Sequence, residues 1–98
     1  MNYKLIIRPA AELELSGAFD WYEERLSGLG AEFLLSVDAV FNSIARNPQQ
    51  YPIIHRTIRR ALTRRFPYEV FYIIEDTKIV IVAVFHAKRN PMRWKDRL

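Results

Sequence analysis

The sequence predicts an α+β domain in which a helical hairpin covers one face of a small, mostly antiparallel sheet of three or four strands. Three observations indicate this class. A short apolar segment of strand type begins the chain, two helical patterns follow it, and two strongly apolar runs lie close together near the C-terminal end. Because neither helix can bury its apolar stripe on the other alone, we expect the sheet to supply the missing surface. The other face of the sheet should then be free for a function.

The first strand is expected over Tyr3–Ile7, a short apolar segment that Arg8 and Pro9 stop. Proline has no backbone N–H to donate and its ring fixes φ, so Pro9 suits the first turn of a helix. From Ala10 to Leu26, apolar residues recur at intervals of three and four, which indicates one buried helix face with an acidic outer side. The residues of this stripe are Leu15, Ala18, Phe19, Tyr22 and Leu26.

Two glycines within three residues, Gly28 and Gly30, end this pattern and favour a turn over a continuing helix. A second helical pattern follows, and it ends at Asn47–Pro48 because a residue before proline is pushed out of the α region. Its apolar positions are Phe33, Leu34, Val37, Val40, Phe41 and Ile44. Two helices joined by so short a turn should lie antiparallel.

The next segment combines a loop with a stretch that fits a strand imperfectly. Gln49–Thr57 contains Pro52 and is expected to be a loop. Ile58–Phe66 can be a strand, although two pairs of arginines interrupt its alternation, and one arginine of each pair then points to each face. The two predicted faces carry Ile58, Arg60, Leu62, Arg64 and Phe66 on one side and Arg59, Ala61, Thr63 and Arg65 on the other. Only one face can pack on the helices, so at least one arginine pair should lie on the open face.

The last two strands are expected over Val70–Ile74 and Ile79–Phe85, which are rich in Val, Ile, Phe and Tyr. A short polar connector, residues 75–78, separates them as in a hairpin. The second run contains no polar residue before His86, so it lacks the alternation of a strand with one solvent-facing side. It therefore predicts a central strand that is covered on both faces.

Length and composition limit the possible classes. Ninety-eight residues suffice for one domain with a modest core, so residues 1–98 are expected to form a single domain. Half of the residues are hydrophobic and 13% are aromatic, which argues against disorder. The chain has no apolar run of membrane-spanning length and no N-terminal signal, which predicts a cytoplasmic location without membrane association. The lack of cysteine excludes disulfides, thiol nucleophiles and cysteine zinc sites.

Charge is divided unevenly along the chain. Residues 1–50 carry four basic and seven acidic side chains, a net charge of −3, whereas residues 51–98 carry eleven basic and four acidic ones, a net charge of +7. An anionic partner, either nucleic acid or an acidic protein, and a merely solvated arginine-rich surface account for this balance equally well. The concentration of arginine in 56–65 and 88–97 favours a partner. The candidate contacts with a target or an acidic partner are Arg59, Arg60, Arg64, Arg65, Lys88, Arg89, Arg93 and Trp94.

Few residues offer catalytic chemistry. The sequence has no glycine-rich phosphate loop, no paired histidines at metal spacing and no cluster of carboxylates in its basic half, so we expect neither a metal nor a cofactor. A metal-independent ribonuclease would need a base for the 2′-hydroxyl, an acid for the leaving oxygen and cations for the phosphate. His86 is the one candidate base of the basic half besides His55. A histidine at a strand end is more often structural and hydrogen-bonded to a neighbouring backbone.

Four segments of the chain form a recognisable set. They are WYEERLSGLGAEF (Trp21–Phe33), NPQQYP (Asn47–Pro52), RRFPYEVFY (Arg64–Tyr72) and HAKRNPMRWKDR (His86–Arg97). In this order and spacing they resemble the RelE/ParE superfamily of bacterial toxins from type II toxin-antitoxin systems. The resemblance implies the RelE/ParE fold and a small toxin that arrests growth and is held inactive by an antitoxin wrapped around it. Antitoxin segments of this kind are acidic and amphipathic, so the basic half would be the complementary surface.

Two activities occur in this superfamily, namely cleavage of mRNA on the ribosome in the RelE type and poisoning of DNA gyrase in the ParE type. Glu69 stands where RelE-type toxins tend to carry an arginine, and Trp94, which cannot transfer a proton, stands where they use a tyrosine or histidine. The resemblance therefore favours a ParE-like toxin of the plasmid stabilisation type that is not an enzyme, with DNA gyrase as its target. The alternative is a metal-independent, ribosome-dependent endoribonuclease with Arg65 and His86 as catalytic candidates. A non-toxic basic binding module is the third possibility.

Overall fold

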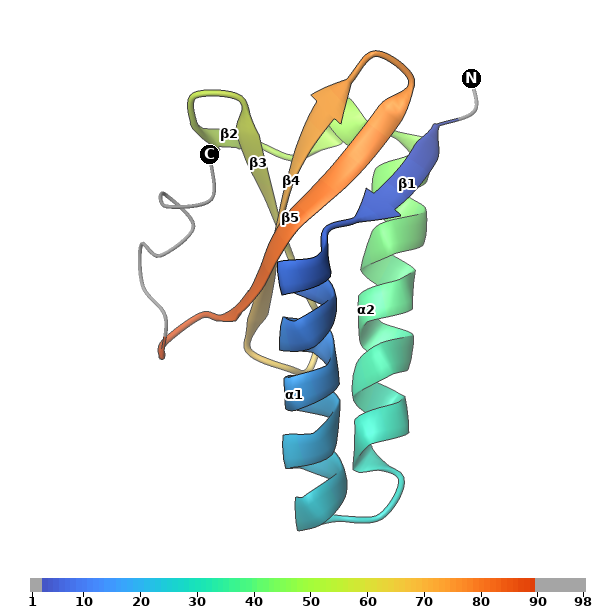
Figure 1. Ribbon diagram of the computed structural model, residues 1–98, viewed down its shortest axis with the longest axis vertical. Helices are drawn as coiled ribbons and strands as arrows, with labels where there is room; N and C mark the ends of the chain where they lie inside the picture. The colour runs from blue at the N-terminus through green and yellow to red at the C-terminus, as the bar shows by residue number, and fades with distance from the viewer. Residues whose placement is uncertain (1–2, 90–98) are drawn as a thin grey trace.

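The computed structural model describes residues 3–89 and has five strands and two α-helices in one sheet-and-hairpin arrangement (Figure 1). Its elements are β1 (Lys4–Ile7), α1 (Pro9–Arg25), α2 (Leu29–Arg46), the 3-10 turn η1 (Pro48–Gln50), β2 (Ile53–His55), β3 (Ile58–Leu62), β4 (Tyr68–Glu75) and β5 (Lys78–His86). The strands form a sheet in the order β1-β5-β4-β3-β2, with β1 parallel to β5 and the other pairs antiparallel. The α+β class is confirmed, with one strand more than expected.

The two helices form the predicted antiparallel hairpin, and a carboxylate fixes the turn between them. Pro9 is the first residue of α1, where its missing N–H costs nothing. The Glu23 side chain accepts hydrogen bonds from the backbone N–H groups of Gly28 at 2.8 Å and Gly30 at 2.9 Å, which caps the start of α2. Gly28 has the left-handed φ of 90° that glycine adopts most easily, whereas Gly30 lies inside α2 against Phe19. Within residues 3–89, no helix combines the length and the apolar character that a membrane span requires.

The helices cover one face of the sheet through an apolar core. Side chains at alternate positions of β4, namely Tyr68, Val70 and Tyr72, point to this core. Rings from both helices, from the turn after β3 and from β4 pack edge to face in this core, with centroids 4.9–5.5 Å apart for Tyr22–Phe66, Phe33–Phe66 and Phe33–Tyr68. This aromatic cluster fixes where the turn after β3 lies relative to α2.

The face opposite the helices carries a second apolar cluster, so the expectation of a wholly free face is wrong for the middle of the sheet. Its buried members are Ile58, Phe71, Ile73, Val80, Val82, Ala83 and Phe85. The prediction that Ile79–Phe85 is covered on both sides is confirmed, because every residue of that run is buried. A continuous apolar run without alternation is the sequence signature of such a strand.

Two expectations between residues 49 and 66 are corrected. The predicted loop contains β2, an edge strand of three residues beside β3, which is too short to give a pattern in the sequence. The predicted strand ends at Leu62, because the Thr63 hydroxyl donates to the Phe66 carbonyl at 2.7 Å and Arg65 adopts a φ of 71°, which together form a turn. Phe66 therefore packs in the helix-facing core, and Arg64 and Arg65 belong to the turn and not to a sheet face.

Candidate functional site

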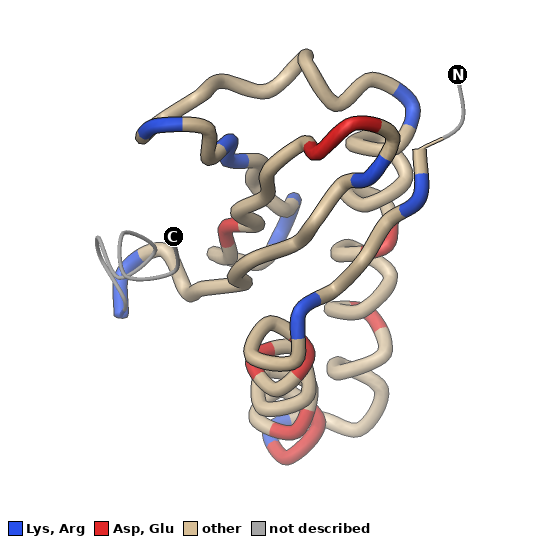
Figure 2. The backbone as a smooth tube through the Cα atoms, turned by 45° about the horizontal axis from the view of Figure 1, so that its top comes forward, with Lys and Arg blue, Asp and Glu red and all other residues tan. Residues whose placement is uncertain are grey.

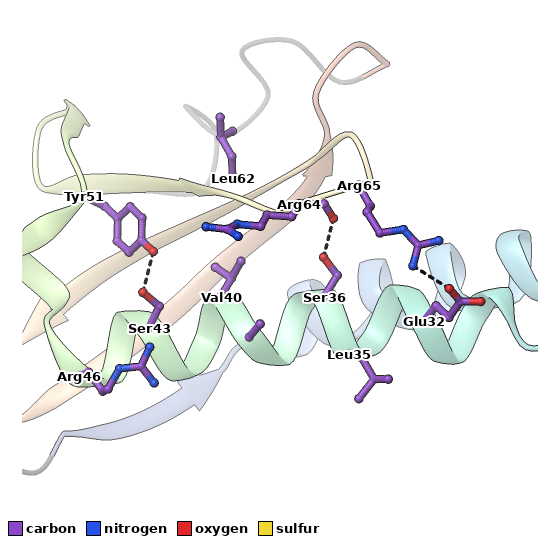
Figure 3. A pocket seen from close by; sticks show the side chains of 11 residues that line it. Glu32, Leu35, Ser36, Val40, Ser43, Arg46, Tyr51, Leu62, Arg64 and Arg65 are labelled. Atoms are coloured by element: carbon purple, nitrogen blue, oxygen red, sulfur yellow. Dashed lines mark hydrogen bonds and ion pairs between the residues drawn. The ribbon is translucent and has the colours of Figure 1, made fainter.

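A groove of about 610 Å³ runs beside α2, on the side where the turn after β3 approaches the helix (Figure 3). We call it the α2 groove. Its lining residues are Glu32, Leu35, Ser36, Ala39, Val40, Ser43, Arg46, Tyr51, Leu62, Arg64 and Arg65. They come from α2, from the segment after η1, from the end of β3 and from the turn that follows it, so the groove exists only because the sheet packs on the helical hairpin.

Apolar side chains form the base and the edges of the α2 groove. Figure 3 shows Val40 on α2 facing the strand, whereas Leu35 on the helix and Leu62 on the strand point outward on opposite sides of the groove. Leu35 is 68% exposed and Leu62 is 59% exposed, which is high for leucine. Exposed apolar side chains beside a concave surface are a feature of docking sites for other molecules.

Three arginines also line the α2 groove. Arg64 extends into the groove above Val40, and Arg46 stands at the end of the groove where α2 ends (Figure 3). Neither makes an ion pair with a carboxylate among residues 3–89. Arg65 does, because its guanidinium contacts the Glu32 carboxylate at 2.6 Å. The groove therefore presents unneutralised positive charge next to apolar surface.

The turn that carries Arg64 and Arg65 is held in place by several hydrogen bonds. The Ser36 hydroxyl on α2 donates to the Arg64 carbonyl at 2.7 Å, and the Thr63 N–H donates to the Tyr68 carbonyl at 3.1 Å. The opposite end of the groove is fixed as well, since the hydroxyls of Tyr51 and Ser43 lie 2.8 Å apart (Figure 3). Its walls are consequently formed before any ligand arrives.

Two of the predicted contact residues are used inside the molecule. The Arg59 guanidinium donates to the carbonyls of Gln49 at 3.1 Å and Tyr51 at 2.6 Å, and so it fixes the segment after η1. Arg60 forms an ion pair with Glu69 at 3.3 Å across β3 and β4. Burial raises the pKa of Glu69, and the neighbouring Arg60 opposes that rise. These two arginines therefore stabilise the sheet region, and their contact with a partner stays a prediction.

The other described candidates lie at the end of β5, in a second group of cations and rings. His86 accepts hydrogen bonds at Nδ1 from the backbone N–H groups of Lys88 at 3.1 Å and Arg89 at 3.2 Å. Arg89 donates to the Tyr68 hydroxyl at 3.1 Å, and its guanidinium lies 5.3 Å from the ring centroid of Trp21. Arg93 and Trp94 lie outside the residues that the structure describes.

The arrangement around His86 determines its protonation. Because Nδ1 accepts two N–H groups, the neutral ring carries its proton on Nε2 and has no free basic nitrogen. Burial lowers the pKa of His86, and the charges of Arg89 and Lys88 lower it further. Within residues 3–89, no three His, Asp or Glu side chains are grouped as metal ligands would be.

The charge asymmetry of the sequence also has a spatial counterpart. The acidic residues of the first half all lie on α1 and α2, whereas the basic residues of residues 51–89 lie on strands and turns (Figure 2).

Sequence reasoning missed Leu35, Val40 and Arg46 as residues of the candidate site. A signal existed for Leu35, because it is a leucine outside the apolar stripe of its helix.

Comparison with known proteins gives three concordant findings. Residues 5–91 match a family described as ParE toxin of type II toxin-antitoxin system, parDE. Toxin ParE2 of Mycobacterium tuberculosis is 30% identical over 92 residues, which are 93% of this chain and 88% of that protein. Two solved structures share the fold. A chain of the chromosomal ParDE system from P. aeruginosa has a TM-score of 0.76 at 14% identity and covers 86% of this chain and 95% of its own length. A chain of the toxin-antitoxin complex RelBE2 from M. tuberculosis has a TM-score of 0.57 at 22% identity, and the match covers 88% of this chain and 99% of that one.

Proposed function

We propose that this chain, which belongs to the ParE toxin family of type II toxin-antitoxin systems, arrests growth by acting on DNA gyrase and is neutralised by an acidic antitoxin seated in the α2 groove. The observation that carries the neutralisation half is that two exposed leucines of the groove, Leu35 and Leu62, lie on either side of Arg64, which makes no ion pair within residues 3–89. An amphipathic acidic segment complements both features at once.

The dimensions of the groove suit a helical occupant. Its lining residues on α2 extend from Glu32 to Arg46, about 21 Å along the helix at 1.5 Å per residue. A partner helix of about four turns covers this length and places an apolar side chain toward the groove at every third or fourth residue. Acidic residues beside that stripe would then reach Arg46 and Arg64, at the two places where the groove is positive.

The gyrase half of the proposal is supported by the family and by the chemistry of the described residues. The family match is to ParE, and RNA cleavage would need a proton carrier that His86 does not offer in this arrangement. Glu69, at a position where RelE-type toxins tend to carry an arginine, places a carboxylate beside Arg60 and reduces its use as a phosphate ligand. We assign the contact with gyrase to the exposed group of Lys88 and Arg89, which shares no residue with the α2 groove.

The test of the target uses two assays side by side. The purified chain is added to DNA gyrase in a supercoiling assay, and the chain expressed without its antitoxin is examined by primer extension on translated mRNA. We expect inhibited supercoiling and uncut mRNA. Unchanged supercoiling at saturating protein overturns the gyrase assignment, and defined cuts in mRNA replace it with the RelE-type activity.

The test of the two surfaces separates toxicity from neutralisation. The double variant Lys88→Ala with Arg89→Ala should lose inhibition of gyrase and still bind the antitoxin, whereas Arg64→Ala should remain toxic and escape neutralisation. Lys78→Ala, at the opposite end of β5, removes an exposed positive charge and serves as the control. Equal effects of all these variants would show that only net charge matters and would contradict the assignment.

A further inference from the structure

One of the three groove arginines is already paired inside the chain. The Arg65 guanidinium contacts the Glu32 carboxylate at 2.6 Å through one nitrogen and one oxygen, and the two side chains are 63% and 47% exposed. Both residues line the α2 groove at the end where α2 begins (Figure 3). An ion pair with a single contact in this much water is weak, because solvent screens it and the guanidinium keeps other donors unused.

The position of Arg65 does not depend on Glu32. Its backbone has the left-handed φ of 71° within a turn that the Thr63 hydroxyl closes and that Ser36 ties to α2. The loss of the Glu32 contact would therefore free the guanidinium without moving the turn that presents it. Glu32 in turn lies in the first turn of α2, where the helix dipole stabilises a carboxylate that has lost its partner.

From this geometry we propose that Arg65 binds an acidic side chain of the partner, and that Glu32 competes with that side chain for the Arg65 guanidinium. The inference rests on the proposed docking of an acidic antitoxin in the α2 groove. In the free toxin the Glu32 carboxylate forms an ion pair with the Arg65 guanidinium. On docking, a partner carboxylate takes its place and makes the paired contacts that a planar guanidinium offers.

This competition gives the groove selectivity for charge. A partner that carries Asp or Glu opposite Arg65 gains a new ion pair and releases Glu32 to a favourable position. A partner with an apolar residue there leaves the internal pair intact and gains nothing at this end of the groove. A partner with lysine meets Arg65 directly and is disfavoured by like charge.

The experiment measures binding of the full chain to a synthetic amphipathic peptide about four turns long, with Leu every third and fourth residue and Glu on both flanks. Glu32→Gln should bind the peptide about two- to fivefold more tightly, in the range of an exposed ion pair that is no longer competed for. Asp38→Asn is the matched control, because it removes an exposed negative charge from the same helix without lining the groove. It should change the affinity by clearly less.

A double substitution shows whether Glu32 acts through Arg65. In the Arg65→Ala background, Glu32→Gln should give no more than the Asp38→Asn control. If Glu32→Gln matches Asp38→Asn in the original background, or if its gain persists without Arg65, the competition does not exist. If Arg64→Ala and Leu35→Ala leave peptide binding unchanged, the α2 groove is not the docking site. The proposed neutralisation through this groove then fails together with this inference, whereas the gyrase half of the proposed function is unaffected. Far-ultraviolet circular dichroism of each variant confirms that it is folded.

Discussion

Leu35→Ala tests the docking surface with a magnitude that follows from its exposure. The substitution removes three carbon atoms, worth about 2.4 kcal/mol when fully buried at about 0.8 kcal/mol each. Leu35 is 68% exposed in the free protein, so about two thirds of this value, roughly 1.6 kcal/mol, is still to be gained when a partner covers it. Leu35→Ala should therefore weaken antitoxin binding roughly 15-fold.

The stability of the free protein should hardly respond to the same substitution. Only the buried third of Leu35 is lost, which is below about 1 kcal/mol, and alanine has a better helix propensity than leucine. Isothermal titration calorimetry with the antitoxin and thermal unfolding of the free chain measure the two effects separately. Leu26→Ala is the control, since Leu26 is 63% exposed at the end of α1 and does not line the α2 groove. Equal losses of affinity for the two variants, or no loss for Leu35→Ala, would refute the reasoning.

Three further predictions concern the scaffold. A Cβ at Gly30 would meet the ring and the backbone carbonyl of Phe19 at 2.8 Å, so Gly30→Ala should lower the free energy of unfolding by about 1–3 kcal/mol. A Cβ at Gly17 would meet nothing within 4 Å, so Gly17→Ala should raise the free energy of unfolding by about 0.5–1 kcal/mol. Denaturant unfolding that ranks the two variants in the opposite order would contradict this packing. The pKa of His86 should lie below 6.5 in an NMR titration, because burial and the charges of Arg89 and Lys88 lower it. The contribution of His86 to stability is then present above pH 6.5 and is lost as the pH falls from 6.5 toward the pKa of the folded state. A measured pKa at or above 6.5 would exclude the two N–H contacts at Nδ1. The buried Tyr72 hydroxyl donates to the Pro48 carbonyl at 2.6 Å, so Tyr72→Phe should lower the free energy of unfolding by about 1–3 kcal/mol. Burial raises the pKa of Tyr72 to about 12, so the original protein should lose stability as the pH rises from the ordinary tyrosine pKa of 10.0 to about 12. Unfolding at alkaline pH should show that Tyr72→Phe lacks this loss.

Much of the fold follows from local patterns in the sequence. The three-and-four spacing of apolar residues placed both helices, and the two runs around residues 75–78 placed the β4–β5 hairpin. The strand β2 has only three residues and follows Pro52, so no alternation can identify it; its place is set by pairing with β3. The end of β3 was also misplaced, because the side-chain bonds of Thr63 and the left-handed backbone of Arg65 leave no trace in a hydrophobic pattern.

The positive charge of the candidate site was predictable from the sequence, but the residues that line it were not. An arginine count cannot tell Arg59, which donates to two backbone carbonyls, or Arg60, which pairs with Glu69, from Arg64, whose side chain has no ion pair within residues 3–89. The difference depends on contacts between residues distant in sequence. Glu32 and Arg65 are an example, since they lie 33 positions apart in the sequence and only the packing of the sheet on α2 brings them together.

The most direct test of the account is methyl NMR of the leucine-labelled full chain during titration with its acidic antitoxin. Docking in the α2 groove predicts that the methyl resonances of Leu35 and Leu62 shift, while those of Leu13 and Leu26, which are also exposed, stay in place. The reverse pattern, with Leu13 or Leu26 shifted and the groove leucines unchanged, would contradict the claim that this groove receives the partner.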